Sequence, residues 1–428
     1  MRLILLALIL LFAGCARHGA PEPGVLHDPA IVPWWRSFGS EALTDAIETS
    51  LSRHPSLASY RHRLEQLKAI RAQNLARLRP SLTASAGYSA TYDEESRYDD
   101  YSLSLAFDYD PDIFSKNRDL LSAAGYDLEA VRLEWLAAKN EFAAQIAKDW
   151  AGYCYQRRIT EALAERVALL ERYVALYESY YLSGERGFDQ LSNTRRELIR
   201  ARSDLERSRL TERLYKASFE YETDTAPRCA SLKEKVPLPD ISIADLAKKP
   251  DLLVIRYKLF AAQKRAASAE KYRLPDLRLS AFLRFGAERL ADLIDSWLLG
   301  WGVSLAQSIY EGGARKARAR EQRERAREIV QQYKDALLRS LLSLKNARIG
   351  VEEAELAIAQ NSADLAALRS RHEALELKFA SQEIGGLDLL RSRIDLLVAR
   401  EQILRSKRDL LQNEIDYLKT TALCKDSQ

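Results

Sequence analysis

Four short segments of the chain alternate apolar with polar residues, and they lie in two pairs separated by much longer segments with a helical pattern. The alternation predicts strands at about 82–92, 101–110, 277–285 and 297–306. Because successive side chains of a strand point to opposite faces, each strand would have one apolar and one mostly polar face. Each is roughly 9–11 residues long, the length of a tilted strand that spans a membrane. Four strands cannot close a barrel and lipid does not tolerate an open sheet edge, so membrane strands of this kind would need several chains in one barrel.

Aromatic residues stand at several ends of these segments, where a membrane barrel places its interfacial girdle. The candidates for this girdle are Tyr88, Tyr92, Tyr101, Tyr109, Trp297 and Trp301. The segments that join the strands within each pair, 93–100 and 286–296, are polar and acidic, as outward-facing loops of an outer-membrane barrel are. Behind the two pairs, Pro111 and the glycines Gly312 and Gly313 mark breaks between a strand and a helix.

Long helices are predicted at about 115–183, 188–222, 315–382 and 387–422. The two longest would each extend about 100 Å, which is too long for a helix in the core of a globular domain and calls for coiled-coil packing. Apolar residues at steps of three and four supply the seam, as in Leu163, Val167, Leu170, Val174, Tyr177 and Tyr181. The last helix has two adjacent seams, one through Leu390 and Leu397 and one through Leu389 and Leu396. Two seams predict a neighbour on each side, as in a sheet of helices closed into a tube; a wide apolar face in a solid four-helix bundle is the alternative.

The two halves of the chain repeat each other. Pro55 and Pro250 stand in matching segments, as do Pro80 and Pro275, 195 residues apart in each case. We therefore expect one unit of helix, strand, strand, very long helix and helix that is used twice. The predicted division is a signal peptide (1–14), a lipidated tether (15–40), a first repeat (41–230), a linker (231–250) and a second repeat (251–428).

The chain begins with a segment typical of an exported lipoprotein. An apolar run at 3–12 is too short to span a bilayer and fits the core of a signal peptide. The run ends in Leu11-Phe12-Ala13-Gly14-Cys15, which resembles the lipobox of bacterial lipoproteins, a family in which the signal is removed before a cysteine that carries a covalent lipid. We expect Cys15 to carry that lipid, and Ala16 after it favours the outer membrane. An ordinary secretory signal with an incidental cysteine is the alternative.

Composition narrows the function classes. The chain of 428 residues is 47% hydrophobic and 29% charged, which is ample for a core, and its net charge of +4 gives no argument for nucleic acid. No nucleophile, base or metal-ligand spacing supports an enzyme, so we expect no catalytic residue, no metal and no cofactor other than the lipid. Cys154 is expected to be a small buried apolar residue. Cys229 and Cys424 lie just past helical runs at similar places in the two repeats and are candidates for a disulfide; two free thiols are the alternative.

A set of motifs in a fixed order resembles one family, the TolC-like outer-membrane channels and in particular their lipid-anchored OprM and NodT type. The motifs are Trp34-Trp35-Arg36-Ser37-Phe38, the strand lead-ins at 78–82 and 274–277, the segment 310–315 and the two Gly-x-Asp helical turns. The resemblance implies a mainly α-helical homotrimer in which twelve strands form one membrane barrel and twelve helices continue it as a tunnel. It also implies outer-membrane lipid, a periplasmic adaptor and an inner-membrane pump, expected to be of the RND type, as partners.

The resemblance also places the functional residues of such a duct at the far helical turns. Residues of the adaptor-docking tip would be Ser183, Gly184, Gly187, Gln382, Gly385 and Gly386. Gln382 stands where glycine is usual, so we expect the second turn to be shaped differently. Asp388, with Asp189 as its equivalent in the first half, would form a cation-sensitive ring at the closed end. A first-turn carboxylate that stabilises its own helix is the alternative for Asp388.

The prediction is a passive outer-membrane exit duct for efflux or secretion. The competing hypothesis is a periplasmic coiled-coil lipoprotein that acts as an adaptor or scaffold and conducts nothing. Such adaptors have one hairpin with compact β domains rather than two pairs of amphipathic strands. The cargo is not named by the sequence, and metal ions, drugs, peptides and proteins stay open.

Overall fold

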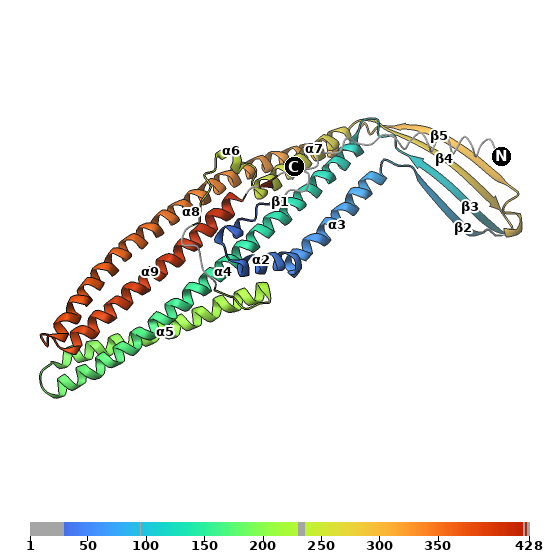
Figure 1. Ribbon diagram of the computed structural model, residues 1–428. Helices are drawn as coiled ribbons and strands as arrows, with labels where there is room; N and C mark the ends of the chain where they lie inside the picture. Colours follow the sequence, from blue (N-terminus) through green and yellow to red (C-terminus); the bar gives the residue numbers. More distant parts are fainter. Residues whose placement is uncertain (1–29, 95, 230–235, 423, 426–428) are drawn as a thin grey trace.

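The computed structural model describes residues 30–94, 96–229, 236–422 and 424–425. The described chain is elongated, with a sheet at one end and two helical turns at the other (Figure 1). In chain order its elements are β1 (Ala30–Ile31), η2 (Trp34–Phe38), α2 (Glu41–Arg53), α3 (Pro55–Ala76), β2 (Ser81–Tyr92), β3 (Arg97–Tyr109), α4 (Lys116–Leu182), α5 (Phe188–Thr223), α6 (Ile243–Leu246), α7 (Pro250–Lys271), β4 (Asp276–Ala287), η3 (Leu290–Asp292), β5 (Trp297–Ala306), α8 (Ala314–Ala380), α9 (Gly386–Thr421) and β6 (Cys424–Lys425).

The same order of helix, two strands, long helix and helix occurs in both halves, with equal helix lengths. Helices α3 and α7 have 22 residues each, α4 and α8 have 67 each, and α5 and α9 have 36 each. Local chemistry explains the starts: α3 and α7 each begin with a proline, Pro55 and Pro250, whose fixed φ suits the first helical position. The four alternating segments lie on β2, β3, β4 and β5, and β3 begins four residues earlier than the predicted strand.

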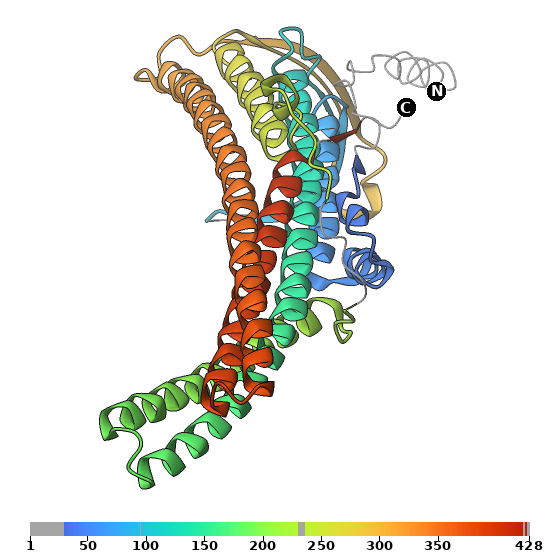
Figure 2. The same cartoon turned by 60° about the vertical axis from the view of Figure 1, so that its left-hand side comes forward.

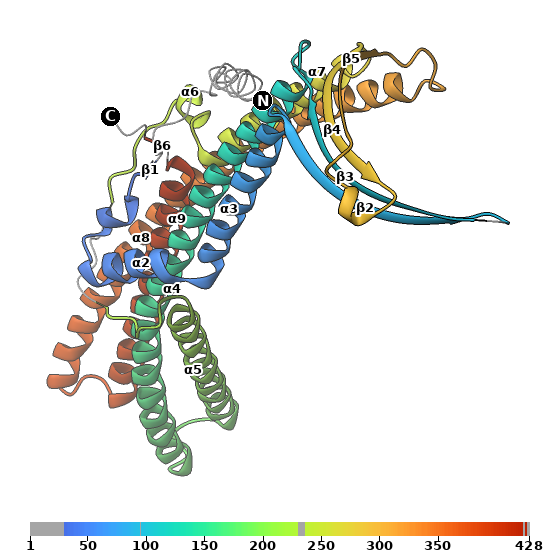
Figure 3. The same cartoon turned by 90° about the vertical axis from the view of Figure 1, so that its right-hand side faces the viewer.

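The helices form one layer rather than a solid bundle. Helices α3 and α5 pack against one side of α4, α7 and α9 pack against its other side, and α8 packs against α7 and α9 (Figure 3). Across the layer the order is therefore α3 or α5, then α4, then α7 or α9, then α8. A core cluster shows why α4 needs two seams: Leu163 and Leu170 of α4 share it with Leu205 of α5 and Ile394 of α9.

The N-terminal elements cover one face of this layer, near the middle of α4. Trp34 and Phe38 of η2, with Ile47 of α2, pack on Trp150 of α4. The Trp34 Nε1–H donates to Asn140 Oδ1 at 2.8 Å, and this buried hydrogen bond fixes η2 on α4. Strands β1 and β6 pair antiparallel beside this cluster, so the two ends of the described chain meet there.

The disulfide prediction was wrong in its partner. Cys229 is bonded to Cys154 and not to Cys424. The segment after α5 turns back onto α4, where Arg228 accepts a hydrogen bond from Trp150 Nε1–H at 3.0 Å, and this brings Cys229 to Cys154. Cys424 instead lies on β6, where its backbone pairs with Ile31. Cys154, predicted as a small apolar residue, is buried and bridged.

No helix within the described ranges combines the length and the apolar character that crossing a membrane requires. Cys15, the predicted site of the lipid, lies outside the described residues.

Candidate functional site

The register of the sheet places the apolar residues of all four strands on one face. The strand order is β2-β3-β4-β5, and every neighbouring pair is antiparallel. In one row across the sheet, Ala84 faces Leu105, Leu105 faces Leu283, and Leu283 faces Leu299. In the next row but one, Phe107 faces Ala281, which faces Trp301. The alternation of each separate strand therefore adds up to one apolar surface, on which the Trp301 side chain is 81% exposed.

The opposite face is mostly polar. Ser85 faces Ser104, Ser104 faces Arg284, and the two serine hydroxyls lie 2.8 Å apart. The two outer strands, β2 and β5, each have a neighbour on one side only in the described chain. The open edges of such a sheet present backbone N–H and C=O groups with which further strands can pair.

The predicted girdle residues lie on the apolar face, mostly toward the ends of the strands. Tyr88 faces Tyr101 with ring centroids 4.9 Å apart, and Tyr92 lies under the Arg97 guanidinium, all in the halves of the strands near the loops. Tyr109 ends β3 on the helical side, and Trp297 begins β5. Trp301 is the exception, because it lies at the middle of β5 and not at an end.

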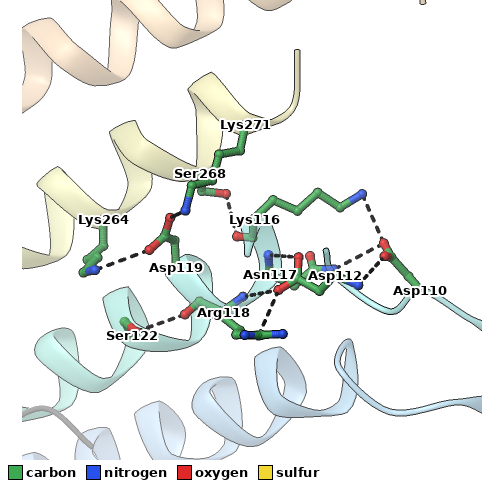
Figure 4. A network of polar contacts seen from close by, with 10 residues as sticks. All are labelled: Asp110, Asp112, Lys116, Asn117, Arg118, Asp119, Ser122, Lys264, Ser268 and Lys271. Atoms are coloured by element: carbon green, nitrogen blue, oxygen red, sulfur yellow. Dashed lines mark hydrogen bonds and ion pairs between the residues drawn. The ribbon is translucent and has the colours of Figure 1, made fainter. Parts of the chain in front are cut away.

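The connection from β3 to α4 is held by a dense polar network (Figure 4). Asp112, which is buried, accepts hydrogen bonds from the backbone N–H groups of Asn117 and Arg118 at 3.0 and 2.9 Å, so it caps the start of α4. Lys116 forms ion pairs with Asp110, at 3.1 Å, and with Asp276 of β4. Burial alone would lower the pKa of Lys116, but its hydrogen bonds to Asp276 and Asp110 outweigh burial and raise that pKa above its ordinary value.

The same network fastens α7 onto α4. Asp119 of α4 accepts from Lys271 at 2.5 Å and from Lys264 at 3.4 Å, and Ser268 donates to the Lys116 carbonyl at 2.9 Å. Sequence reasoning missed this group, because its members are spread over 160 residues and no local spacing connects them. The equivalent connection from β5 to α8 uses Gly312 and Gly313, both at positive φ, in place of the acidic cap.

A charged groove of about 1200 Å³ crosses α3, α4, α7 and α8. Its ion pairs link three helices: Glu134 of α4 binds Arg63 of α3 at 2.8 Å and Lys258 of α7 at 2.6 Å. Asp127 also lines the groove, and it lies about 140° around α4 from Asn140, which contacts η2. The groove therefore lies on the face of the layer that η2 and α2 leave uncovered.

The two far turns have the same conformation, so the expected difference at Gln382 was wrong. In the first turn Gly184 N–H donates to Tyr181 O and Glu185 N–H to Tyr180 O, both at 3.0 Å. In the second turn Gln382 N–H donates to Phe379 O and Glu383 N–H to Lys378 O, at 3.0 and 2.9 Å. This is the pattern of a Schellman C-cap in both cases. Gln382 adopts φ of 62° where Gly184 has φ of 78°, so a non-glycine residue is held in the left-handed region.

The remaining predicted tip residues begin the helices that leave these turns. Gly187 and Gly385 are the N-caps of α5 and α9, and Gly386 is the first residue of α9. Ser183 ends α4 as its C-cap and its hydroxyl donates to Glu185 Oε1 at 3.0 Å.

Asp189 and Asp388, the predicted gate residues, both lie exposed in the first turns of α5 and α9, but the predicted equivalence of the two was wrong. Counted from the N-caps Gly187 and Gly385, Asp189 is the second residue of its helix and Asp388 the third, so Leu387 stands in the place of Asp189. A carboxylate in that place stabilises its helix through the dipole, so the position by itself fits both interpretations of Asp388. One turn further along α9, Arg391 donates to both carboxylate oxygens of Glu197 on α5, at 3.0 and 2.8 Å. This link between two hairpins was missed, because Glu197 and Arg391 are 194 residues apart.

His372 lies near the second turn on the contact between α8 and α9. Its Nδ1 is 2.7 Å from the Ser392 hydroxyl and its Nε2 is 3.3 Å from Glu376 Oε1. His372 is therefore a packed polar residue on the contact between these two helices. Among the described residues, no cluster of three or more His, Cys, Asp or Glu side chains could hold a metal ion.

Known proteins share this sequence pattern and this fold. A family model described as outer membrane efflux protein matches residues 46–213 and 244–422. The chain is 24% identical over 425 residues to the pyoverdine export outer membrane protein OpmQ of Pseudomonas aeruginosa, with 87% of each chain covered. Its structure is similar to the CmeC outer membrane channel of Campylobacter jejuni, with a TM-score of 0.81, 18% identity and coverage of 92% of this chain and 89% of that one. It is also similar to the outer membrane protein VceC of Vibrio cholerae, with a TM-score of 0.80, 20% identity and coverage of 91% and 98%.

Proposed function

Because this chain belongs to the outer membrane efflux protein family, we propose that it is the outer-membrane exit duct of a tripartite efflux or secretion system. Three copies of a duplicated unit share one barrel of twelve strands and one tunnel of twelve helical columns. The duct conducts passively from a periplasmic adaptor, which binds the far turns, and an inner-membrane pump of the RND type. A lipid on Cys15 anchors each copy in the outer membrane. No side chain is required to act as a catalyst.

One observation carries the proposal: within the described part of one chain, the sheet has an exposed apolar face and two edges that no further strand pairs with. The apolar side chains of β5 are the clearest case, since Trp301, Val303 and Leu305 are all at least 60% exposed. Burying such a surface is favourable at about 25 cal/mol per Å², and lipid supplies the partner for the face. Strands of further copies supply partners for the edges, because backbone groups in lipid must be paired.

The helical layer has open edges as well, and their exposed apolar side chains lie at similar distances from the turns of their own hairpins. Helix α5 exposes Leu210 and Leu214 at one edge, and α8 exposes Ile349 and Leu356 at the other. Leu214 lies 29 residues from Glu185 in the first turn, and Leu356 lies 27 residues from Glu383 in the second. At 1.5 Å per residue these distances are about 44 and about 40 Å. A second copy that sets its α8 against α5 therefore covers both stripes.

The charged groove supports a water-filled tunnel. Its charged side chains are both acidic and basic, and they lie on the face of the layer opposite η2 and α2. Such a wall suits conduction of polar solutes without strong retention of either charge. The relative OpmQ is named for the export of pyoverdine. Because the identity is 24%, we propose export as the function of this chain but do not propose pyoverdine as its cargo.

Cysteine cross-linking tests the assembly directly. In a Cys424→Ser background, Leu214→Cys is combined with Leu356→Cys, and the detergent-extracted protein is oxidised and run on a non-reducing gel. We expect ladders up to three chains, because the two positions meet only between copies. The control pairs Leu214→Cys with Leu377→Cys, which is at least as exposed as Leu356 but close to the second turn. Equal cross-linking in both variants, or bands of a single chain only, would contradict the proposed tube.

A charge placed on the apolar face separates the duct from a soluble adaptor. Leu103→Asp with Leu105→Asp puts two carboxylates where the proposal places lipid, at a cost of a few kcal/mol. We expect the variant to be lost from the outer-membrane fraction. Ser102→Asp with Ser104→Asp, on the opposite face of the same strand, is the matched control and should assemble. Normal assembly of the leucine variant would favour the non-conducting periplasmic lipoprotein.

A further inference from the structure

An aromatic ring stands on the polar face of the sheet, where the proposed function places the water-filled lumen. Phe282 of β4 shares this face with Arg278, Ser280 and Arg284, because side chains two residues apart on a strand point the same way. Its cross-strand neighbours are Ala106 of β3 and Gly300 of β5. The other aromatic residue of this face among the four strands, Tyr98, faces Thr91 near the loop end of the sheet.

Gly300 leaves room for the far end of the Phe282 ring. A Cβ atom built on Gly300 would overlap the ring of Phe282, so any other residue would push the ring away. The ring atoms nearest to a Cβ on Gly300 would be Cζ and Cε1, and both neighbours of Phe282 in its row, Ala106 and Gly300, are small. The Phe282 side chain is accordingly 42% exposed. The exposed part of the ring is available for contact with another aromatic ring.

Two guanidinium groups flank the ring on the same strand. Arg284 lies about 7 Å along the strand from Phe282, and Arg278 lies about 13 Å in the other direction. Of the acidic residues on this face, Asp276 is bound by Lys116, and Asp100 lies 4.0 Å from Arg284 with both side chains more than half exposed. Asp108 faces Ser280, in the next row but one from Phe282. The spacing of ring and cation fits a solute that joins an aromatic ring to one negative charge.

We propose that Phe282, seated on Gly300 and paired with Arg284, is a stacking station on the pore wall that retains small aromatic anions in passing. The station deepens the proposed function, since it assigns a preferred cargo class to the duct. Phe282 contacts the aromatic ring of the solute and Arg284 its carboxylate. Weak retention suits a conduit, because solutes must also leave.

Ligand-observed NMR on the detergent-extracted full chain tests the station without requiring an open channel. Benzoate is compared with cyclohexanecarboxylate, which has the same charge and a similar size but no aromatic ring. We expect benzoate to bind roughly five-fold more tightly, which is the scale of one aromatic pair. Phe282→Leu should abolish that difference while leaving the binding of cyclohexanecarboxylate nearly unchanged. Phe285→Leu, on the apolar face of the same strand, should retain the preference.

A second variant separates the contribution of the Phe282 ring to binding from that of the Arg284 charge. Arg284→Gln should weaken both anions by a similar factor and leave the preference for benzoate in place. Equal binding of the two anions to the unmodified protein, or a preference that survives Phe282→Leu, would overturn the station. The same preparation is first checked by the α5–α8 cross-link: a cross-linked trimer without benzoate preference refutes the station alone, whereas absence of the cross-link refutes the duct.

Discussion

Helices α4 and α8 have the same length and stand in the same place in the two halves, yet one is an interior element and the other an edge. Buried side chains follow α4 from Lys116 to Tyr177, because α4 has helices on both of its sides. On α8, the buried residues are Ala319, Ser340, Ala347, Val351 and Ala354. Two helices of equal length in equivalent places of the two halves therefore differ in burial, and the more charged sequence belongs to the helix at the edge of the layer. The proposed assembly places the next copy on the unburied stripe of α8.

The hairpins that these two helices begin differ in how they are fastened. The first is closed by the Cys154–Cys229 disulfide and the second has Glu352 and Ser427 at the corresponding positions. The network around Lys116 and Asp112 holds the start of α4, whereas two glycines precede α8 (Figure 4). In Figure 2 the α4–α5 hairpin reaches beyond the α8–α9 hairpin. The first half thus has the more strongly fixed hairpin.

The largest expected effect comes from charging the open edge of α8. Leu342→Asp with Ile349→Asp would place two unpaired carboxylates in the proposed contact between copies, where each costs several kcal/mol. We expect the detergent-extracted protein to become monomeric by size-exclusion chromatography with light scattering. Ser343→Asp on the same exposed stretch is the control and should leave the mass unchanged. A trimeric mass for the double variant would mean that α8 is not the joining edge.

Removal of the disulfide should act on one hairpin alone. Cys154→Ala with Cys229→Ser removes the bond that closes a loop of 75 residues. In the chain-entropy model, this lowers the free energy of unfolding by about 4 kcal/mol because the unfolded chain gains conformational freedom. We expect faster amide hydrogen exchange in lower α4 and in α5, with α8 and α9 unchanged as the internal reference. Cys424→Ser should have no such effect. Equal acceleration in both hairpins would contradict local fastening.

The two turns can be exchanged in sequence. Gly184→Ala forces a residue with a Cβ into the left-handed region and should destabilise the last turn of α4 by about 1 kcal/mol. Gln382→Gly should stabilise the last turn of α8 by a similar amount, because it removes that strain. Hydrogen exchange at the Ser183 and Ser381 amides measures both effects. Changes of the same sign in the two variants would show that the turns are held differently despite their shared hydrogen bonds.

The smallest expected effect depends on pH. Burial, with Asp149 nearby, raises the pKa of Glu222 on α5 to about 8, and the matching residue on α9 is Thr420. Since the unfolded carboxyl has a pKa near 4.3, the unfolded state binds fewer protons between these values, so stability falls as pH rises from about 4.5 to 8. Glu222→Gln removes this dependence. We expect the variant to gain about 1 kcal/mol at pH 8, after allowance for solvent screening, and nothing at pH 4, in thermal unfolding scans.

Much of the fold could be predicted because its signals are local and periodic. Alternation at 297–306 and the seam through Leu163 and Leu170 each report a period of the backbone, and each lies on the expected strand or helix. The partner of Cys229 could not be predicted in this way, since the similar positions of Cys229 and Cys424 in the two repeats pointed to the wrong pair. The bridge depends on how the chain turns back after α5, and no periodicity encodes that path.

Among the candidate functional residues, the sequence determined which residues begin and end each turn and which strand faces are apolar. Tertiary structure alone decided that four apolar faces join in one surface, because strand register sets which residues share a row. It also decided that Lys116 meets Asp276, that Arg391 meets Glu197 and that Phe282 lies on Gly300. These contacts join residues from separate elements, so their geometry comes from packing between elements and from no pattern within one.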